Sequence, residues 1–166
     1  MVTVPFVLLL GFLSGRSVPG GADNRWYAVL AKPALTPPDW VFPIAWSLLY
    51  VLMGLALAMI IHARGSRGRG LAMLAFAIQL VLNLAWTPVF FGMHLIGASL
   101  VLLVAMFASA LATAMLFGRI RALAALLLVP YLGWLLFAGY LNYQIGVLNP
   151  GAETLVPTSS STQILN

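Results

Sequence analysis

Long apolar runs separated by short polar breaks dominate the pattern of this chain. A helix needs about 20 apolar residues to cross the hydrocarbon core of a bilayer, and four runs reach that length. An earlier run is shorter and is interrupted by two glycines and an arginine, and we interpret it as a fifth span. The predicted fold is an all-α membrane protein, a bundle of five transmembrane helices at about 2–18, 41–62, 71–91, 96–117 and 122–148.

A cleavable signal peptide is the alternative interpretation of the first run. Signal peptides begin with basic side chains and end at a small-residue A-x-A cleavage pattern. Residues 2–18 begin without a basic side chain, and no such pattern follows them. We therefore favour a membrane span, with Arg16 extending its charged end to the interface.

One of the breaks between the spans is long. Residues 19–39 include Asp23, a predicted N-cap for a short helix at about 24–31, and Lys32-Pro33 is expected to end that helix. A long connection with its own helix is typical of a lid or binding loop. The last residues, 149–166, are polar and are predicted to be a disordered tail, so the helical domain is expected to cover residues 1–148.

Composition supports a membrane location. The chain is 63% hydrophobic and only 7% charged, whereas a soluble domain carries roughly 25% charged residues. The net charge of +5 comes from basic residues in the breaks between apolar runs, which is typical of residues that flank membrane spans. We therefore expect an integral multi-pass membrane protein without a nucleic-acid partner. The absence of cysteine excludes disulfides, thiolate metal sites and cysteine nucleophiles.

Basic residues are unevenly shared between the two sides of the predicted bundle. Five spans place the two termini on opposite sides, and cytoplasmic loops carry an excess of Lys and Arg. The amino-terminal side holds Arg64, Arg67, Arg69, Arg119 and Arg121, and the opposite side holds Arg16, Arg25 and Lys32, offset by Asp23 and Asp39. We therefore predict a cytoplasmic amino terminus, with the loop 19–39 and the carboxy-terminal tail on the other side.

Three predicted spans each carry amide or aromatic side chains on one face. Consecutive helical residues turn by about 100°, and this spacing places Pro43, Trp46 and Tyr50 together on the second span. The corresponding residues are Gln79, Asn83, Trp86 and Phe90 on the third span, and Tyr131, Trp134, Ala138, Leu141 and Asn142 on the fifth. Because lipid does not favour an amide at mid-membrane, these faces are expected to point inward.

Helix packing is the alternative explanation of these faces, because amides form hydrogen bonds between membrane helices. Indoles are bulky and prevent close helix approach, so aromatics on the same faces favour a cavity for a flat, apolar ligand. No Asp, Glu, Lys or Arg lies inside spans two to five, which argues against ion-coupled transport. His62 and His94 lie near span ends on opposite sides and are interpreted as structural. We recognise no metal site and no nucleophile–base pair.

Four motifs, which follow one another along most of the chain, resemble the translocator protein family (TspO/MBR). That family includes the tryptophan-rich sensory proteins of bacteria and the mitochondrial peripheral benzodiazepine receptor. The motifs are W-Y-x-x-L-x-K-P at 26–33, P-P-x-W-V-F-P-x-A-W-x-x-L-Y at 37–50, Q-L-x-x-N-x-x-W-T-P-x-F-F-G at 79–92 and P-Y-L-x-W-x-x-F-A-x-x-L-N at 130–142.

The resemblance implies a five-helix bundle, commonly a homodimer, that binds protoporphyrin IX or haem and needs no cofactor. Members also bind cholesterol and benzodiazepine-type ligands, so a sterol or other lipid is a further expected partner. The pocket is expected among the helices beneath the loop 19–39. With the faces described above, the predicted ligand-binding residues are Trp26, Tyr27, Trp40, Phe42, Pro43, Trp46, Tyr50, Asn83, Trp86, Phe90, Tyr131, Trp134, Ala138, Leu141 and Asn142.

Three functions are compatible with this resemblance. The first is a sensor or regulator of porphyrin levels. The second is light- and oxygen-dependent degradation of porphyrin, which the resemblance attributes to tryptophans that match Trp46 and Trp134, the candidate catalytic residues. The third is passive transport of porphyrin or lipid. The sterol pattern of animal members needs a basic residue after the tyrosine of the last span, and none follows Tyr143, which weakens the expectation of a sterol ligand.

Overall fold

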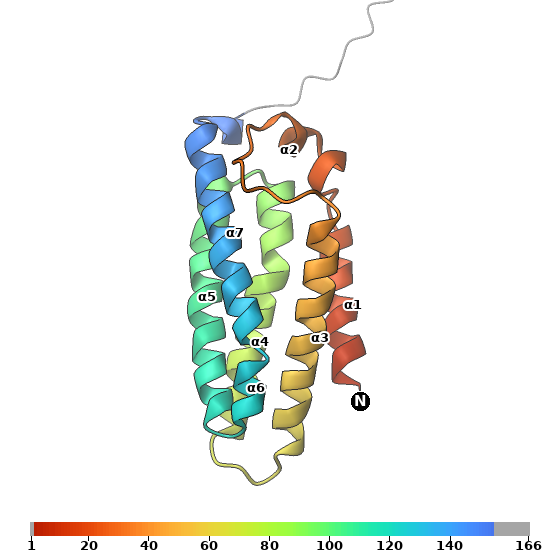
Figure 1. Cartoon of the computed structure of the whole chain (residues 1–166), viewed down its shortest axis with the longest axis vertical. Helices are drawn as coiled ribbons and strands as arrows, with labels where there is room; N and C mark the ends of the chain where they lie inside the picture. The colour runs from red at the N-terminus through yellow and green to blue at the C-terminus, as the bar shows by residue number, and fades with distance from the viewer. Residues whose placement is uncertain (1, 155–166) are drawn as a thin grey trace, which may run out of the picture.

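A computed structural model describes residues 2–154 of the chain as an all-helical molecule (Figure 1). Within that part, five helical stretches are long and apolar enough to cross a membrane, which confirms the predicted five-helix bundle. The helices are α1 (Thr3–Arg16), α2 (Arg25–Val29), α3 (Val41–His62), α4 (Arg69–Thr87), α5 (Ile96–Gly118), α6 (Ala122–Leu126) and α7 (Val129–Leu148), with the helical turns η1 (Gly21–Asp23), η2 (Pro88–Gly92) and η3 (Ala152–Thr154).

The long helices run side by side, and the short α2 lies across one end of the bundle (Figure 1). α1 packs on α3, α4 packs on α5, and α5 packs on α7, while the short α6 contacts both α5 and α3. The backbones of α3 and α7, by contrast, come close at very few positions. Aromatic side chains fill the space between these two helices. We refer to this boundary as the α3–α7 seam.

Proline explains two departures from the predicted spans. Pro88 has no N–H to donate to the carbonyl of Leu84, so α4 gives way to the π-helical turn η2. The carbonyl of Leu84 instead accepts a hydrogen bond of 2.7 Å from the hydroxyl of Ser14 in α1. Pro130, the second residue of α7, likewise separates α7 from α6 within the stretch 122–148 that we predicted as one span.

Two glycines let α1 and α3 pack with their backbones almost in contact. A Cβ atom on Gly54 would lie 2.7 Å from the Cα atom of Val4. A Cβ atom on Gly11 would overlap the ring of Tyr50. Gly15, one turn further along α1, has open space around it. The close approach of the two helices therefore depends on Gly11 and Gly54.

The loop 19–39 between α1 and α3, which we call the lid, contains the short helix α2, and Asn24 is the N-cap of that helix. The Oδ1 atom of Asn24 accepts a hydrogen bond of 2.9 Å from the N–H of Tyr27, so the prediction that Asp23 caps this helix was wrong. The Nδ2 atom of Asn24 also donates to the carbonyls of Pro19 and Phe91, each at 2.9 Å. A carboxylate cannot donate those two bonds, which explains why the amide occupies this position.

The structure describes the first part of the predicted disordered tail. Residues 149–154 are ordered, form the turn η3 and pack against the lid. Ala152 is buried in the same apolar cluster as Trp26. The prediction was therefore wrong for residues 149–154, because short-range polarity does not show hydrogen bonds to a distant segment. The rest of that tail, 155–166, lies outside the described residues.

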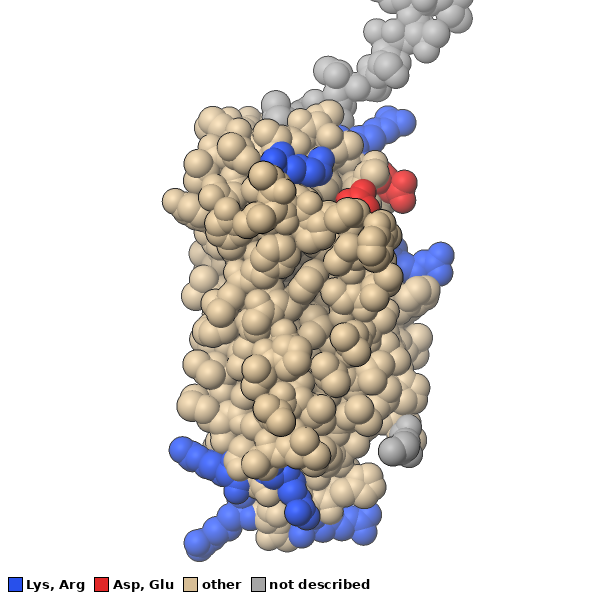
Figure 2. Space-filling view, in the orientation of Figure 1, with Lys and Arg blue, Asp and Glu red and all other residues tan. Residues whose placement is uncertain are grey.

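Charged side chains lie at the two ends of the molecule, with a broad uncharged band between them (Figure 2). The start of α1 lies at the same end as the α3–α4 and α5–α6 connections (Figure 1). These connections contain four of the five arginines of the predicted cytoplasmic side, and the fifth, Arg69, is the first residue of α4. The lid and the end of α7 lie at the opposite end (Figure 1). The side of the membrane to which each end belongs stays a prediction.

Candidate ligand-binding site

A network of buried polar side chains joins three helices inside the bundle. The hydroxyl of Tyr50 in α3 donates to Oδ1 of Asn83 in α4 at 2.8 Å. The Nδ2 atom of Asn83 donates to the hydroxyl of Tyr131 in α7 at 3.1 Å. All three side chains are buried. The structure thus brings the three faces singled out in the sequence together at Asn83.

Aromatic rings surround this network at the α3–α7 seam. Trp46 stacks on Tyr50 with ring centroids 5.4 Å apart. The indole of Trp46 meets that of Trp134 edge to face at 6.3 Å, and Phe42 lies 5.9 Å from Trp134 on its other side. Trp46 and Trp134 are partly buried and face each other across the seam. We call Phe42, Trp46, Tyr50, Tyr131 and Trp134 the bundle cluster.

A second group of aromatic rings lies directly under the lid. Trp86 and Phe90 stack with their ring centroids 5.0 Å apart. Trp26 of α2 meets Phe90 edge to face at 5.5 Å, and Tyr27 meets Phe91 in the same manner at 5.3 Å. Trp26, Tyr27 and Phe90 are buried. We call these five residues the lid cluster.

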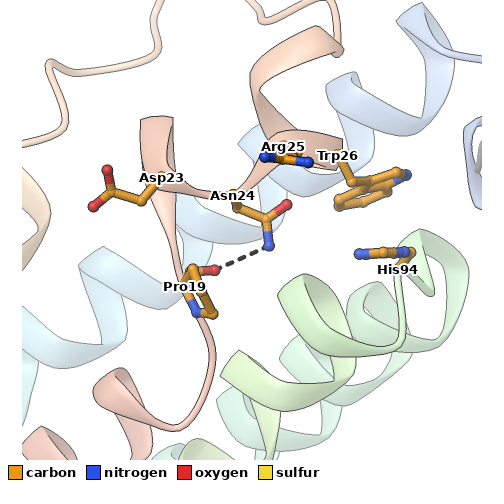
Figure 3. Close-up of a pocket in the computed structure, with 6 residues that line it drawn as sticks. All are labelled: Pro19, Asp23, Asn24, Arg25, Trp26 and His94. Atoms are coloured by element: carbon orange, nitrogen blue, oxygen red, sulfur yellow. Dashed lines mark hydrogen bonds between the residues drawn. The ribbon is translucent and has the colours of Figure 1, made fainter. Parts of the chain in front are cut away.

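Trp26 also forms one wall of a hollow between lid residues and His94 (Figure 3). The hollow has a volume of about 340 Å³ and is lined by Pro19, Asp23, Asn24, Arg25, Trp26 and His94. The imidazole of His94 stacks on the indole of Trp26, with ring centroids 4.5 Å apart. His94 has a φ of 59°, which is uncommon for a residue other than glycine. A second hollow, of about 430 Å³, lies between α5, α7 and residues 149–154.

Two charged side chains, Lys32 and Asp39, influence Tyr27 of the lid cluster, one through its ring and the other through its pKa. The ammonium group of Lys32 lies over the ring of Tyr27, 4.6 Å from its centroid. Burial raises the pKa of the Tyr27 phenol above its usual range, and the negative charge of Asp39 adds to the rise. Both the neutral phenol ring and the nearby ammonium group are thus in place for a cation–π contact.

Five of the predicted ligand-binding residues lie outside both clusters and outside the polar network. Four of these five make no side-chain hydrogen bond within the described residues. Trp40 is 65% exposed and Pro43 is exposed, both near the start of α3. Ala138 packs against the bundle core, and Leu141 is buried in α7. Trp40 and Pro43 thus face the surroundings of the bundle, whereas Ala138 and Leu141 are part of its packing.

Asn142, the fifth residue outside the clusters, connects α7 to α5 through hydrogen bonds of its side chain. Its Nδ2 atom donates to the carbonyl of Ile96 at 2.9 Å, and its Oδ1 atom accepts from the hydroxyl of Ser99 at 2.8 Å. Asn142 and Ser99 are both buried. For this amide, the alternative explanation of interhelical packing therefore describes the observed contacts.

The site contains residues that we did not predict to bind ligand. Phe91 and His94 lie against the lid residues Tyr27 and Trp26. Phe91, next to Phe90, lies off the face that the helical spacing singled out, and His94 lies beyond the predicted span. Gln79 lies one turn before Asn83 on α4, and its spacing on that face was the available signal. Gln79 is buried, and within residues 2–154 neither of its amide atoms has a hydrogen-bond partner; the same holds for the indole N–H of Trp86.

Comparison with known proteins finds matches along nearly the whole helical region. A family model described as the TspO/MBR family matches residues 2–148. The chain is 42% identical over 144 residues to the tryptophan-rich protein TspO of Chlorobaculum tepidum, covering 86% of this chain and 90% of that protein.

Relatives in other organisms show the same range of similarity. The chain is 40% identical to protein CrtK of Rhodobacter capsulatus over 81% of this chain and 84% of that protein. It is 42% identical to the translocator protein of Bos taurus over 86% of each chain. Similarity at this level over nearly the whole helical region shows common descent, and the chain belongs to the TspO/MBR family of membrane proteins.

Proposed function

We propose that this protein binds tetrapyrroles such as protoporphyrin IX or haem within the membrane and acts as a sensor or regulator of porphyrin levels. The single observation that carries the proposal is the meeting of two indoles from separate helices, Trp46 and Trp134, at 6.3 Å. Both are partly buried at the α3–α7 seam, where the two backbones come close at very few positions. A flat macrocycle needs such aromatic surfaces on elements that can separate without breaking backbone contacts.

The bundle cluster and the polar network have complementary roles in this proposal. The macrocycle enters the α3–α7 seam and stacks on Trp46 and Trp134, and the two indoles move apart to make room for it. Asn83 and the hydroxyls that it bonds then offer donors and acceptors to the edge of the ring. Each aromatic contact is worth about 0.5–1.5 kcal/mol beyond the burial of area.

The positive charges of the lid can pair with the propionate side chains of a porphyrin. Spans with apolar interiors give no counter-ion to a propionate, and an unpaired charge in the bilayer is costly. Arg25 and Lys32 are the basic residues of the lid, and both are exposed. In the proposed complex the propionates therefore point toward the lid end of the bundle, where water and these cations stabilise them.

Titration of purified protein with protoporphyrin IX, followed by quenching of tryptophan fluorescence, tests the proposal. The double variant Trp46→Ala, Trp134→Ala is expected to bind about tenfold or more weakly, from the loss of two aromatic contacts. Trp40→Ala is the matched control, because Trp40 is 65% exposed and lies outside both clusters. Equal affinity for the double variant and the wild type would refute binding at the seam.

Degradation and passive transport both require binding first and are separated from it by further measurements. Illumination of the complex in oxygen reports degradation if the Soret band is replaced by a bilin-like absorbance and Trp46→Phe abolishes that product. Uptake of protoporphyrin by protein-containing liposomes above empty liposomes reports transport. Binding without either effect is the outcome expected of a sensor.

A further inference from the structure

Residues 149–154 hold the lid from the side opposite to Asn24. The N–H of Ala31 donates to Oδ1 of Asn149 at 2.8 Å, and Nδ2 of Asn149 donates back to the carbonyl of Ala31 at 2.8 Å. Nδ2 of Asn149 also donates to the carbonyl of Ile145 in α7 at 2.8 Å. One amide side chain therefore ties the end of the lid helix region to the last turn of α7.

The same segment fixes the position of Trp26. The indole N–H of Trp26 donates to the carbonyl of Ala152 at 2.8 Å, and both residues are buried. The ring of Trp26 is held on its other sides by His94, which stacks on it, and by Phe90, which meets it edge to face. Trp26 thus lies between residues 149–154 on one side and η2 with the following His94 on the other.

Residues 149–154 are themselves anchored to α5. A carboxylate oxygen of Glu153 accepts a hydrogen bond of 2.8 Å from the N–H of Gly97, in the first turn of α5. A carboxylate at this position also suits the positive end of the helix dipole. The carbonyl of Asn149 accepts from the N–H of Ala152 at 3.1 Å, which closes the segment into a compact turn. We call residues 149–154 the clasp.

Most hydrogen bonds between the clasp and its partners are exposed to water and can therefore open and close. The Asn149–Ala31 pair and the Glu153–Gly97 bond lie at exposed positions. Water replaces an exposed hydrogen bond at little net cost, so such bonds open and close readily. The bond from Trp26 to Ala152 is buried, so water cannot replace it while the lid is in place.

We propose that the clasp is a positioning element that keeps the lid closed over the bundle, places Trp26, and so controls how fast a ligand enters and leaves. The proposal rests on the proposed function only in assuming that the ligand lies beneath the lid. Asn149 is the central residue, because it bonds the lid through both amide atoms. Loosening the clasp speeds entry and exit together, so the ligand affinity changes less than either rate.

The first test measures the lid without any ligand, by hydrogen exchange of the Trp26 indole N–H in the full-length protein. The variant Asn149→Ala is expected to exchange this proton about tenfold faster, because Asn149 holds the lid without touching the indole itself. Asn149→Asp keeps the acceptor for Ala31 and loses the donor, so an intermediate rate is expected. Gln144→Ala is the matched control, because its amide contacts Tyr140 within α7 and not the lid.

The second test measures the kinetics of protoporphyrin IX binding by stopped-flow tryptophan quenching in the same variants. Asn149→Ala and Glu153→Ala are expected to raise both the association and the dissociation rate several-fold, with an unchanged melting temperature. Indole exchange and both rates equal to those of Gln144→Ala would overturn the proposal. If the wild type does not bind protoporphyrin IX, the proposed function fails, and indole exchange alone still decides the role of the clasp.

Discussion

Asn83 is the residue at which three helices meet. Its side chain accepts from Tyr50 and donates to Tyr131, so one amide links α3, α4 and α7. In a bilayer no water competes for these bonds, and an amide without partners is costly. The paired state explains why a polar residue is stable here and also why it holds hydrogen-bonding groups close to the aromatic rings of the seam.

Loss of one partner in this network is expected to destabilise the protein. Tyr131→Phe leaves one N–H of Asn83 unpaired and should lower the free energy of unfolding by about 1 kcal/mol. Thermal unfolding in detergent measures the change. Tyr143→Phe is the matched control, since Tyr143 lies in the same helix and is 57% exposed. A melting temperature lowered equally in both variants would show that the network contributes nothing specific.

Asn142 is expected to differ from the residues of the bundle cluster. Its amide already bonds α5 through Ile96 and Ser99, so it has a structural role. Asn142→Leu should lower the melting temperature, and it should leave the affinity for protoporphyrin IX within about twofold of the wild type. A large loss of affinity in a variant that remains folded would restore Asn142 to the ligand-binding residues.

At the scale of elements, the helices pack unevenly around the bundle, and the proposed site lies where large side chains separate two of them. α1 and α3 approach until Gly54 almost touches the backbone of Val4. The α3–α7 seam, in contrast, is filled by large rings rather than by close backbone contact. Small residues thus bring the backbones of one boundary close together, and large rings occupy the other boundary.

Enlarging Gly54 is expected to force α1 away from α3. A Cβ atom there would lie 2.7 Å from a backbone atom, which cannot move as a flexible side chain does. Gly54→Ala should therefore cost about 1–3 kcal/mol, the usual range for overpacking, as measured by thermal unfolding. Gly15→Ala should be neutral, because nothing lies within 4 Å of its Cβ position. Similar melting temperatures for the two variants would contradict the observed α1–α3 packing.

The whole molecule has two chemically different ends. One end has the arginine-containing connections of α3–α4 and α5–α6, and the other has the lid, with acidic as well as basic residues (Figure 2). This asymmetry is what the positive-inside rule uses to predict orientation. A homodimer, which the family resemblance implies, likewise stays a prediction at this scale.

Single cysteines test the orientation cleanly, because the chain has no cysteine of its own. Ser66→Cys lies in the α3–α4 connection, and Ala34→Cys lies in the lid at an exposed position. A membrane-impermeant thiol reagent added to intact cells is expected to label Ala34→Cys and to spare Ser66→Cys until the membrane is permeabilised. The reverse pattern would place the amino terminus outside the cytoplasm.

The sequence by itself determined the five spans, the inward faces and the family, because each depends on local chemistry. Apolar length sets the spans, and the helical turn of about 100° places Trp46 with Tyr50 and Asn83 with Trp86 on single faces. These features need no knowledge of what lies opposite. The same reasoning found most members of the bundle cluster, whereas Trp26 and Tyr27 of the lid cluster came from the family resemblance.

Only the tertiary structure decided which side chain meets which partner. Asn83 and Asn142 both sit on amide-bearing faces, yet one joins the rings of the seam and the other bonds α5. The clasp was missed for the same reason, since Asn149 bonds Ala31 across 118 positions of the chain. Contacts between distant segments depend on how helices pack, and a local pattern of polar and apolar residues does not specify that packing.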